Sequence, residues 1–429
     1  MPARRTRGGM DVENRADPGR THAGLYVRAM AKWLAVAMVT GVFCGVVGSL
    51  FHIGVERATE LREQHPWLLW CLPAAGLVIV AFYKLTKTEG QGTNDIIEAV
   101  HHGKKLSIWL LPAIFLGTVL THLCGGSAGR EGAALQIGGS LAATLGKRLR
   151  LDERNMNLIV LCGMSALFTA LFGTPVAATV FSMEVVSVGI LHYSALFPGL
   201  FASLVSLGVT RLMGLEAEGW ALLGTPELTP LSALQVGGLG IGCALVAILF
   251  CTAMHTTAKR YQSMFPNPYV RILVGAALVI ALTCVEGSGA YNGAGSAFIS
   301  AALAGEQAVP WAFLLKIAFT ALTLGAGFRG GEIVPTFFIG AAFGSAVAPL
   351  LGLDPAFGAA IGLIALFCGV VNCPLASILL SVELFGGGTV FFALACALSY
   401  LLSGRFSLYS SQKIVYSKLE PRYIDASAR

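Results

Sequence analysis

The chain has 429 residues and a formal net charge of +6; 55% of its residues are hydrophobic and only 12% are charged. A soluble domain carries about 25% charged residues, so this composition excludes an ordinary soluble protein. The positive balance is interpreted as membrane topology and attraction to anionic lipid, and no nucleic-acid partner is expected.

Eight long runs of the chain contain no Asp, Glu, Lys or Arg. About 20 apolar residues cross a bilayer core as a helix, and lipid offers no partner to unpaired backbone groups. Several runs exceed one crossing and are interrupted by Gly or Pro. The sequence therefore predicts an all-α polytopic membrane protein with more than ten helical pieces. The runs are 33–51, 106–124, 157–183, 185–210, 232–258, 333–353, 355–382 and 384–404.

The first run follows a charged leader and is only the first of many spans, so no cleavable signal peptide is expected. Both ends of the chain are basic, which predicts that both termini are cytoplasmic. We expect a basic segment over 1–30, a membrane domain over 31–404 and a C-terminal segment over 405–429, without a regulatory domain. The leader arginines are Arg4, Arg5, Arg7, Arg15, Arg20 and Arg28.

The two halves of the membrane domain, about 31–215 and 230–404, resemble each other weakly. In "TPVAATVFSMEVVSVG" and "CPLASILLSVELFGGG" a Pro opens an apolar segment, and a Glu follows that Pro nine positions later, at Glu184 and Glu383. Internal repeats with Gly- or Pro-interrupted helices are typical of transporters, whose substrate lies at the repeat interface near the bilayer midplane. The pattern therefore predicts a transport site between the halves.

Three Gly-rich polar blocks interrupt the apolar segments, and each precedes a helix-forming stretch: "GQGTN" (90–94), "GGSAGREG" (125–132) and "GFRGGEIVP" (327–335). Each block is expected to set a helix N-terminus inside the membrane. Such an end carries about half a positive charge and binds anions. Three converging ends would form a site for a small anion.

Glu131 lies in the first turn of one of these helices. Its carboxylate can occupy the anion site, and on protonation it can leave, so one residue can serve as gate, competing anion and proton carrier. The alternative is structural: Arg130 pairs with Glu131 or Glu332 and only holds the fold. Lys316 and Arg329 either face a vestibule or pair with acids, and Glu184 and Glu383 are interpreted mainly as anchors of helix ends.

A catalytic function is not expected. His122 and Ser127 are close in sequence, but no third orienting group and no Gly-x-Ser-x-Gly elbow accompany them. The ten cysteines lack CxxC or His spacing, so buried free thiols are expected rather than disulfides or a metal site. No cofactor is expected.

The blocks "GGSAGREG" and "GFRGGEIVP" and the closing "IVYSKLEPR" resemble the CLC family of anion channels and anion/proton antiporters. The likeness extends over about 30–420. It implies a homodimer with one pore per subunit, two inverted halves and anion sites at the N-termini of broken helices. The expected partners are a halide anion, protons, membrane lipid and a second copy of the chain.

The resemblance also assigns residues. Glu131 matches the gating glutamate, and Tyr416 matches the tyrosine whose hydroxyl faces the anion from the C-terminal helix. Glu184 matches the first of two exchanger glutamates, and Val185 stands where the internal proton-transfer glutamate would be. The anion-binding set implied by the three motifs is Gln91, Gly92, Thr93, Asn94, Gly129, Arg130, Gly132, Ile333, Val334 and Tyr416.

Gln91 in place of the usual serine, Val185 in place of the internal acid, and Glu332 in a "GGE…P" segment resemble the fluoride-exporting CLC-F branch. That branch commonly has Thr where this chain has Val334, and its paired phenylalanines are not evident in "TNDIIEAV". The leading expectation is a proton-coupled fluoride exporter of a bacterial plasma membrane, with Glu131 and Glu332 handling protons. The alternative is a chloride-selective CLC channel or chloride/proton exchanger.

Overall fold

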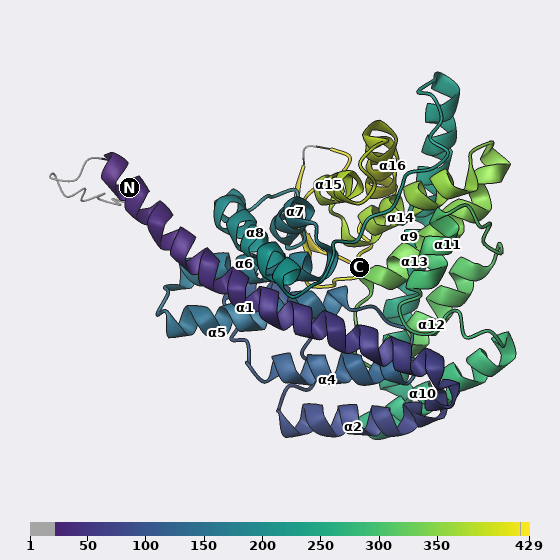
Figure 1. Ribbon diagram of the computed structural model, residues 1–429, viewed down its shortest axis with the longest axis horizontal. Helices are drawn as coiled ribbons and strands as arrows, with labels where there is room; N and C mark the ends of the chain where they lie inside the picture. The colour runs from purple at the N-terminus through teal and green to yellow at the C-terminus, as the bar shows by residue number, and fades with distance from the viewer. Residues whose placement is uncertain (1–21, 421) are drawn as a thin grey trace, which may run out of the picture.

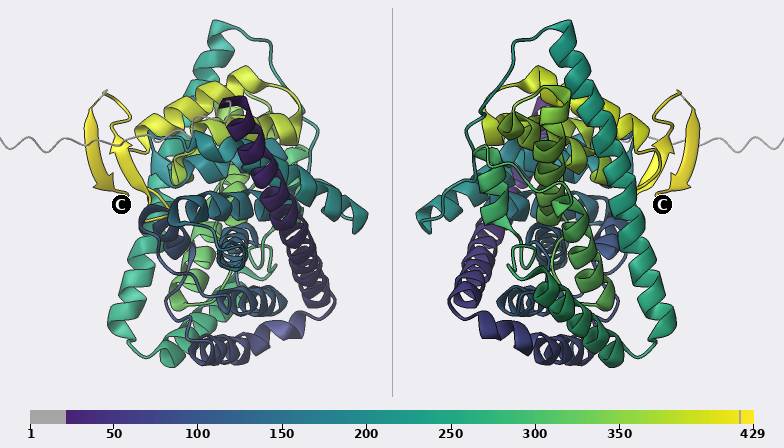
Figure 2. Two further views of the ribbon diagram at one scale, coloured as in Figure 1. Left: turned by 90° about the vertical axis from the view of Figure 1, so that its left-hand side faces the viewer. Right: turned by 90° about the vertical axis from the view of Figure 1, so that its right-hand side faces the viewer.

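The computed structural model describes residues 22–420 and 422–429, which form a helical body with a small sheet at one edge (Figures 1 and 2). The leader arginines before His22 lie outside the described residues. The first helix already begins at His22, before the boundary expected at residue 31, so Arg28 is part of a helix.

Sixteen α-helices follow one another in the described part of the chain, so the expectation of more than ten helical pieces is confirmed. They are α1 (His22–Gln64), α2 (Leu72–Leu85), α3 (Thr93–His102), α4 (Leu110–Leu123), α5 (Glu131–Arg148), α6 (Glu153–Phe172), α7 (Pro175–Glu184), α8 (Leu196–Leu212), α9 (Pro230–Met264), α10 (Pro268–Glu286), α11 (Ser296–Leu303), α12 (Ala312–Ala326), α13 (Ile333–Val347), α14 (Pro355–Val371), α15 (Pro374–Phe385) and α16 (Thr389–Leu402).

Seven helical segments are long and apolar enough to cross a membrane, and five shorter apolar helices accompany them. At 1.5 Å per residue, the 43 residues of α1 extend about 64 Å. That is about twice the thickness of a hydrocarbon core, and the N-terminal end of α1 projects from the body in Figure 1. The shorter apolar helices have 12 to 17 residues, fewer than the about 20 that cross a bilayer core.

Equivalent helices of the two halves pack alike. Helix α5 lies on α6 as α13 lies on α14, and α1 lies on α8 as α9 lies on α16. The thiol of Cys44 points to the Gly163 carbonyl in the first half, as the thiol of Cys243 points to that of Gly362 in the second. The C-terminal end of α7 meets the N-terminal end of α15, and the C-terminal end of α15 meets the N-terminal end of α7. The repeat is therefore real, and its halves are inverted.

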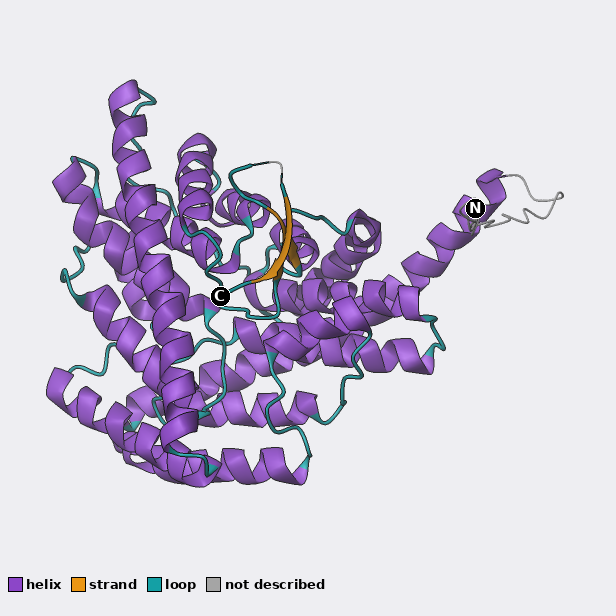
Figure 3. Ribbon diagram, turned by 180° about the vertical axis from the view of Figure 1, so that it is seen from behind, coloured by secondary structure: helices purple, strands orange, loops and turns teal. Residues whose placement is uncertain are grey.

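Strands β1 (Ser187–Val188), β2 (Lys413–Tyr416) and β3 (Tyr423–Ser427) form one sheet in the order β1-β2-β3. The first pair is parallel and the second is antiparallel. Figure 3 shows these strands in orange beside the helices. The sheet ties the C-terminal segment to the end of α7, so the chain after α16 returns to the first half of the repeat.

Candidate anion and proton site

The N-termini of α5 and α13 meet in the middle of the molecule. The amide of Gly129 donates to the Gly331 carbonyl (2.7 Å), and the amide of Gly331 donates back to the Gly129 carbonyl (2.6 Å). A Cβ added at Gly132 would lie 2.7 Å from the Gly331 Cα, so only glycine permits this approach. Because neither N-cap side chain bonds its own helix, the first amides of both helices remain available to an anion.

The third Gly-rich block lies beside the other two. Arg329 Nη1 donates to the Gln91 carbonyl (3.3 Å), and Gln136 of α5 donates to the Thr93 hydroxyl (2.9 Å). Asn94 Oδ1 accepts the Ser411 amide (3.0 Å). The structure therefore brings together three segments that are far apart in the sequence, as their motifs predicted.

Glu131 is the first residue of α5 and is fully buried. Its carboxylate accepts the Arg130 amide (3.0 Å) and Arg130 Nε (3.2 Å). The same carboxylate lines a cavity of about 1310 Å³, which we call the vestibule. A carboxylate bound to backbone N–H at a helix N-terminus, with open space beside it, can stay or swing away as its charge changes.

The guanidinium of Arg130 has three different partners. Besides Glu131, it donates to His52 Nε2 of α1 (3.2 Å) and to Glu218, on the loop between α8 and α9. Arginine can only donate, so His52 Nε2 must be an acceptor and the ring is neutral. Burial raises the pKa of Glu218 above its usual range, and the charge of Arg130 opposes that rise.

Glu332 precedes the first residue of α13 and lies against the start of α5. A Cβ added at Gly132 would be 2.8 Å from Glu332 Oε2, and among the described residues that oxygen has no hydrogen-bond partner. An enclosed carboxylate oxygen without a partner is costly when it is charged. Glu332 therefore has the environment of a group that exchanges a proton. In the described residues it has no ion pair with Arg130, which binds Glu131 and Glu218 instead.

Two residues singled out from the sequence have other surroundings than expected. The expected placement of Tyr416 on a C-terminal helix facing the anion is wrong: Tyr416 is on strand β2, is 45% exposed and packs on Tyr423. Lys316 is fully buried but donates to the Tyr291 carbonyl (3.0 Å) and the Gly293 carbonyl (2.8 Å), so it meets neither an acid nor the vestibule.

Tyr409, not Tyr416, lies near the two glutamates. It is 1% exposed, and in the described part of the chain its hydroxyl has no partner. Gln412 fixes this segment by donating to the carbonyls of Val185 (2.9 Å) and Val371 (2.8 Å). The two tyrosines are seven residues apart, and each is followed by Ser in the sequence. The sequence alone therefore does not show which of them is buried.

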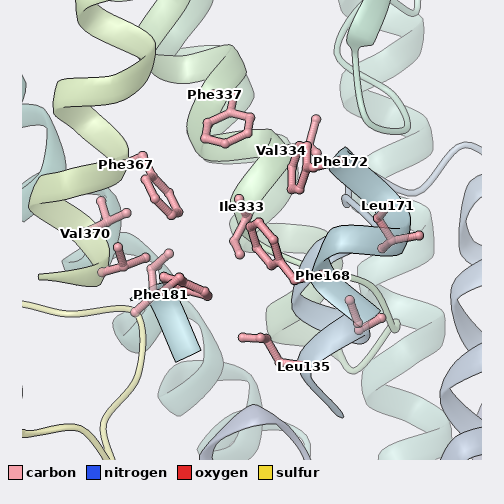
Figure 4. Close-up of a cluster of buried hydrophobic side chains, with 14 of the residues drawn as sticks. Leu135, Phe168, Leu171, Phe172, Phe181, Ile333, Val334, Phe337, Phe367 and Val370 are labelled. Carbon is pink, nitrogen blue, oxygen red and sulfur yellow. The ribbon is translucent and has the colours of Figure 1, made fainter. Parts of the chain in front are cut away.

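An apolar cluster separates the start of α13 from α7 and α14 (Figure 4). The side chains of Ile333 and Val334 lie within it. Five rings close a circle of neighbours, with centroids 4.8–5.7 Å apart: Phe168, Phe172, Phe337, Phe367 and Phe181. Packing of this kind excludes water. Because the five residues come from four helices of both halves, no sequence pattern predicted that their rings are neighbours.

His122 and Ser127, which are close in the sequence, bond different residues. The Ser127 hydroxyl bonds Thr320 Oγ1 (3.1 Å), and His122 Nδ1 bonds the Thr118 carbonyl (2.8 Å). In the part of the chain that the structure describes, no hydrogen bond joins Ser127 to His122, and all ten cysteines are free.

A family model for voltage gated chloride channels matches residues 75–404. The chain belongs to the CLC family. It is 37% identical over 398 residues to a chloride/fluoride channel protein of Pseudomonas syringae pv. tomato, covering 91% of this chain and 88% of the relative. It is 29% identical to the H(+)/Cl(−) exchange transporter ClcA of Salmonella arizonae, covering 82% of this chain and 80% of the relative.

Among solved structures, this CLC chain resembles a CLC-type fluoride/proton antiporter with a TM-score of 0.87 and 32% identity, over 92% of this chain and 99% of that one. A cyanobacterial Cl−/H+ antiporter has the same fold with a TM-score of 0.75 and 20% identity, over 86% of this chain and 94% of that one. The chain is therefore a multi-pass membrane protein with the fold of CLC transporters.

Proposed function

We propose that this chain is a proton-coupled anion antiporter that exports fluoride from the cell in exchange for inward protons. The observation that carries the proposal is the pair of carboxylates, Glu131 and Glu332, at two helix N-termini that meet through Gly129 and Gly331. Helix ends bind an anion without a full charge of their own, and the glutamates add groups that can take a proton.

In this mechanism ionised Glu131 holds the anion position at the start of α5. Protonation from the vestibule weakens its bonds to the Arg130 amide and guanidinium, so the side chain leaves and an anion takes its place. Glu332 then exchanges a proton on the other side of the helix ends. Tyr409 and the first amides of α5 and α13 are the proposed anion contacts, together with Gln91, Thr93 and Asn94.

The charges that line the vestibule and a second cavity support outward anion transport. The vestibule is lined by six glutamates and two arginines; its acidic residues attract protons and repel anions. A second cavity is lined by Lys84, Arg271 and Arg329 with Glu89. By the positive-inside rule we place the basic side in the cytoplasm and the vestibule outside. The same rule supports cytoplasmic termini, and the relative from Pseudomonas supports a protein of a bacterial plasma membrane.

Fluoride is proposed over chloride because the antiporter structure with 32% identity is named for fluoride alone. The relative from Pseudomonas is named for both chloride and fluoride. The likeness to ClcA keeps chloride/proton exchange as the second candidate. We also propose a homodimer, from the resemblance to the family.

The test is the flux from liposomes that contain the purified protein, recorded with fluoride-selective and chloride-selective electrodes under matched gradients. We expect fluoride efflux to exceed chloride efflux by at least about tenfold, which corresponds to about 1.4 kcal/mol of discrimination. Equal fluxes, or chloride efflux alone, would contradict fluoride as the substrate and favour the chloride exchanger.

A further inference from the structure

The second cavity, which we call the basic cavity, has a volume of about 420 Å³. It lies between the end of α2, the start of α10 and the loop that follows α12. Helices α2 and α10 lie at the lower edge of Figure 1, and α12 packs on α10. It shares no lining residue with the vestibule. The basic cavity is therefore a separate feature from the glutamate site.

Two arginines line this space, Arg271 from α10 and Arg329 from the loop that follows α12. Among the described residues neither forms an ion pair with a carboxylate, and Glu89, which also lines the cavity, forms none either. Lys84 adds a third positive charge, with its amino group 4.4 Å from the centre of the Tyr269 ring. Like charges that are brought together without a counter-charge destabilise the site.

The unpaired hydrogen-bonding atoms around the cavity can all donate. Arg271 Nε, Arg329 Nε and the Tyr83 hydroxyl are enclosed, and none of them has a partner among the described residues. Tyr83 is only 3% exposed, and the Arg329 guanidinium lies over its ring at 4.0 Å. Buried donors without a partner cost free energy and are rare. Because arginine can only donate, the missing partner is an acceptor, and the excess positive charge of the lining favours an anion.

We propose that the basic cavity is a second binding site for a small inorganic anion, one that loads the transport pathway from the side opposite the vestibule. Arg329 connects the two sites. Its Nη1 bonds the Gln91 carbonyl (3.3 Å), and the chain continues from it through Gly330 and Gly331 to Glu332. An anion bound to Arg329 would therefore lie beside the segments that begin α3 and α13. The identity of this anion rests on the proposed function.

The test compares Tyr83→Phe and Arg271→Gln with the unchanged protein in liposomes, with the initial efflux rate measured against internal fluoride concentration. We expect the half-saturating fluoride concentration to rise by about fivefold in each variant, the loss of one hydrogen bond or charge contact, while the maximal rate stays the same. Tyr83→Phe distinguishes a role in anion binding from a merely structural role. Because the Tyr83 hydroxyl has no partner among the described residues, a merely structural role predicts no loss of affinity and unchanged or higher thermal stability.

Lys259→Gln is the matched control, since it removes an exposed positive charge near the end of α9 without touching the cavity. Half-saturation in Tyr83→Phe equal to that of the unchanged protein, or equal effects of Arg271→Gln and Lys259→Gln, would overturn the site. So would an effect that disappears in vesicles of phosphatidylcholine alone, because the occupant would then be an anionic lipid headgroup. If the protein carries chloride instead, the same shifts should appear in the chloride dependence, so a failure of the fluoride proposal is distinguished from a failure of this site.

Discussion

Glu184 and Glu383 each cap the helix to which the other belongs. Glu184, at the end of α7, accepts the Ala376 amide of α15 (2.9 Å), and Glu383, near the end of α15, accepts the Ala177 amide of α7 (2.8 Å). The two bonds are equivalent under the inverted repeat. Buried donors of two short helices are thereby satisfied, so the interpretation of these acids as anchors of helix ends has direct support.

Replacing either acid with Gln should destabilise the protein with little effect on coupling. A carboxylate at a helix N-terminus contributes about 0.5–2 kcal/mol through its charge and its hydrogen bonds. Thermal unfolding in detergent should show a lower Tm for Glu184→Gln and Glu383→Gln, by similar amounts. Loss of proton transport at an unchanged Tm in Glu184→Gln alone would instead make Glu184 a proton carrier.

Glu332→Gln should uncouple protons from anions. The amide keeps the shape of the side chain but cannot take up and release a proton. Anion flux should therefore continue while proton flux falls by at least about a hundredfold, the lower end of what a positioned acid or base contributes. Simultaneous recording of the anion and of internal pH measures both. Glu227→Gln, outside both cavities, is the control. A normal proton-to-anion ratio in Glu332→Gln would leave Glu332 a structural residue.

Glu218→Gln should move the pH dependence of transport. Arg130 forms ion pairs with both Glu218 and Glu131. When Glu218 is replaced by neutral Gln, Glu131 is the only one of these two acids that still pairs with Arg130. A more acidic external pH is then needed to protonate Glu131. We expect the half-maximal rate at an external pH lower by about 0.5–1 unit, the low end of the effect of a neighbouring charge.

The matched control for Glu218 is Glu216→Gln. Glu216 lines the same vestibule and carries the same charge, but in the described residues it has no ion pair with Arg130. A shift of equal size in both variants would show a general effect of vestibule charge, and an alkaline shift in Glu218→Gln would contradict the sharing of Arg130.

Tyr409→Phe should weaken anion binding, whereas Tyr416→Phe should not. The Tyr409 hydroxyl is enclosed near Glu131 and Glu332 and has no protein partner among the described residues, so an anion is its natural acceptor. Loss of one hydrogen bond to a charged group costs about 1.5–3 kcal/mol, which corresponds to at least about a tenfold loss of anion affinity. Calorimetric titration of each variant with the anion measures this affinity. Equal affinities of the two variants would place the anion elsewhere.

The fold was predictable from the sequence because its signals are local. Charge-free runs predicted the membrane-spanning helices, and the recurring Pro-to-Glu spacing predicted the repeat. The caps formed by Glu184 and Glu383 explain that spacing. The Gly-rich blocks pointed to Glu131 and Glu332 since intramembrane glycines and acids are conspicuous. Inversion of the repeat was implied only by the family resemblance.

Partners that depend on tertiary contacts were missed. His52 and Glu218 reach Arg130 from 78 and 88 residues away, and nothing in their own segments marks them. Tyr409 was missed in favour of Tyr416 because burial, which distinguishes the two, is set by the docking of Gln412. The three donors of the basic cavity likewise come from separate helices and loops.

The most direct test of proton-coupled fluoride export is uphill proton movement driven by fluoride. Liposomes containing the protein are loaded with fluoride, placed in fluoride-free buffer at equal pH, and held at zero membrane potential while internal pH is recorded. We predict that fluoride efflux drives protons inward, so that the lumen acidifies, and that Glu131→Gln abolishes this signal. Fluoride efflux without any change in internal pH, or full acidification in Glu131→Gln, would contradict the proposal.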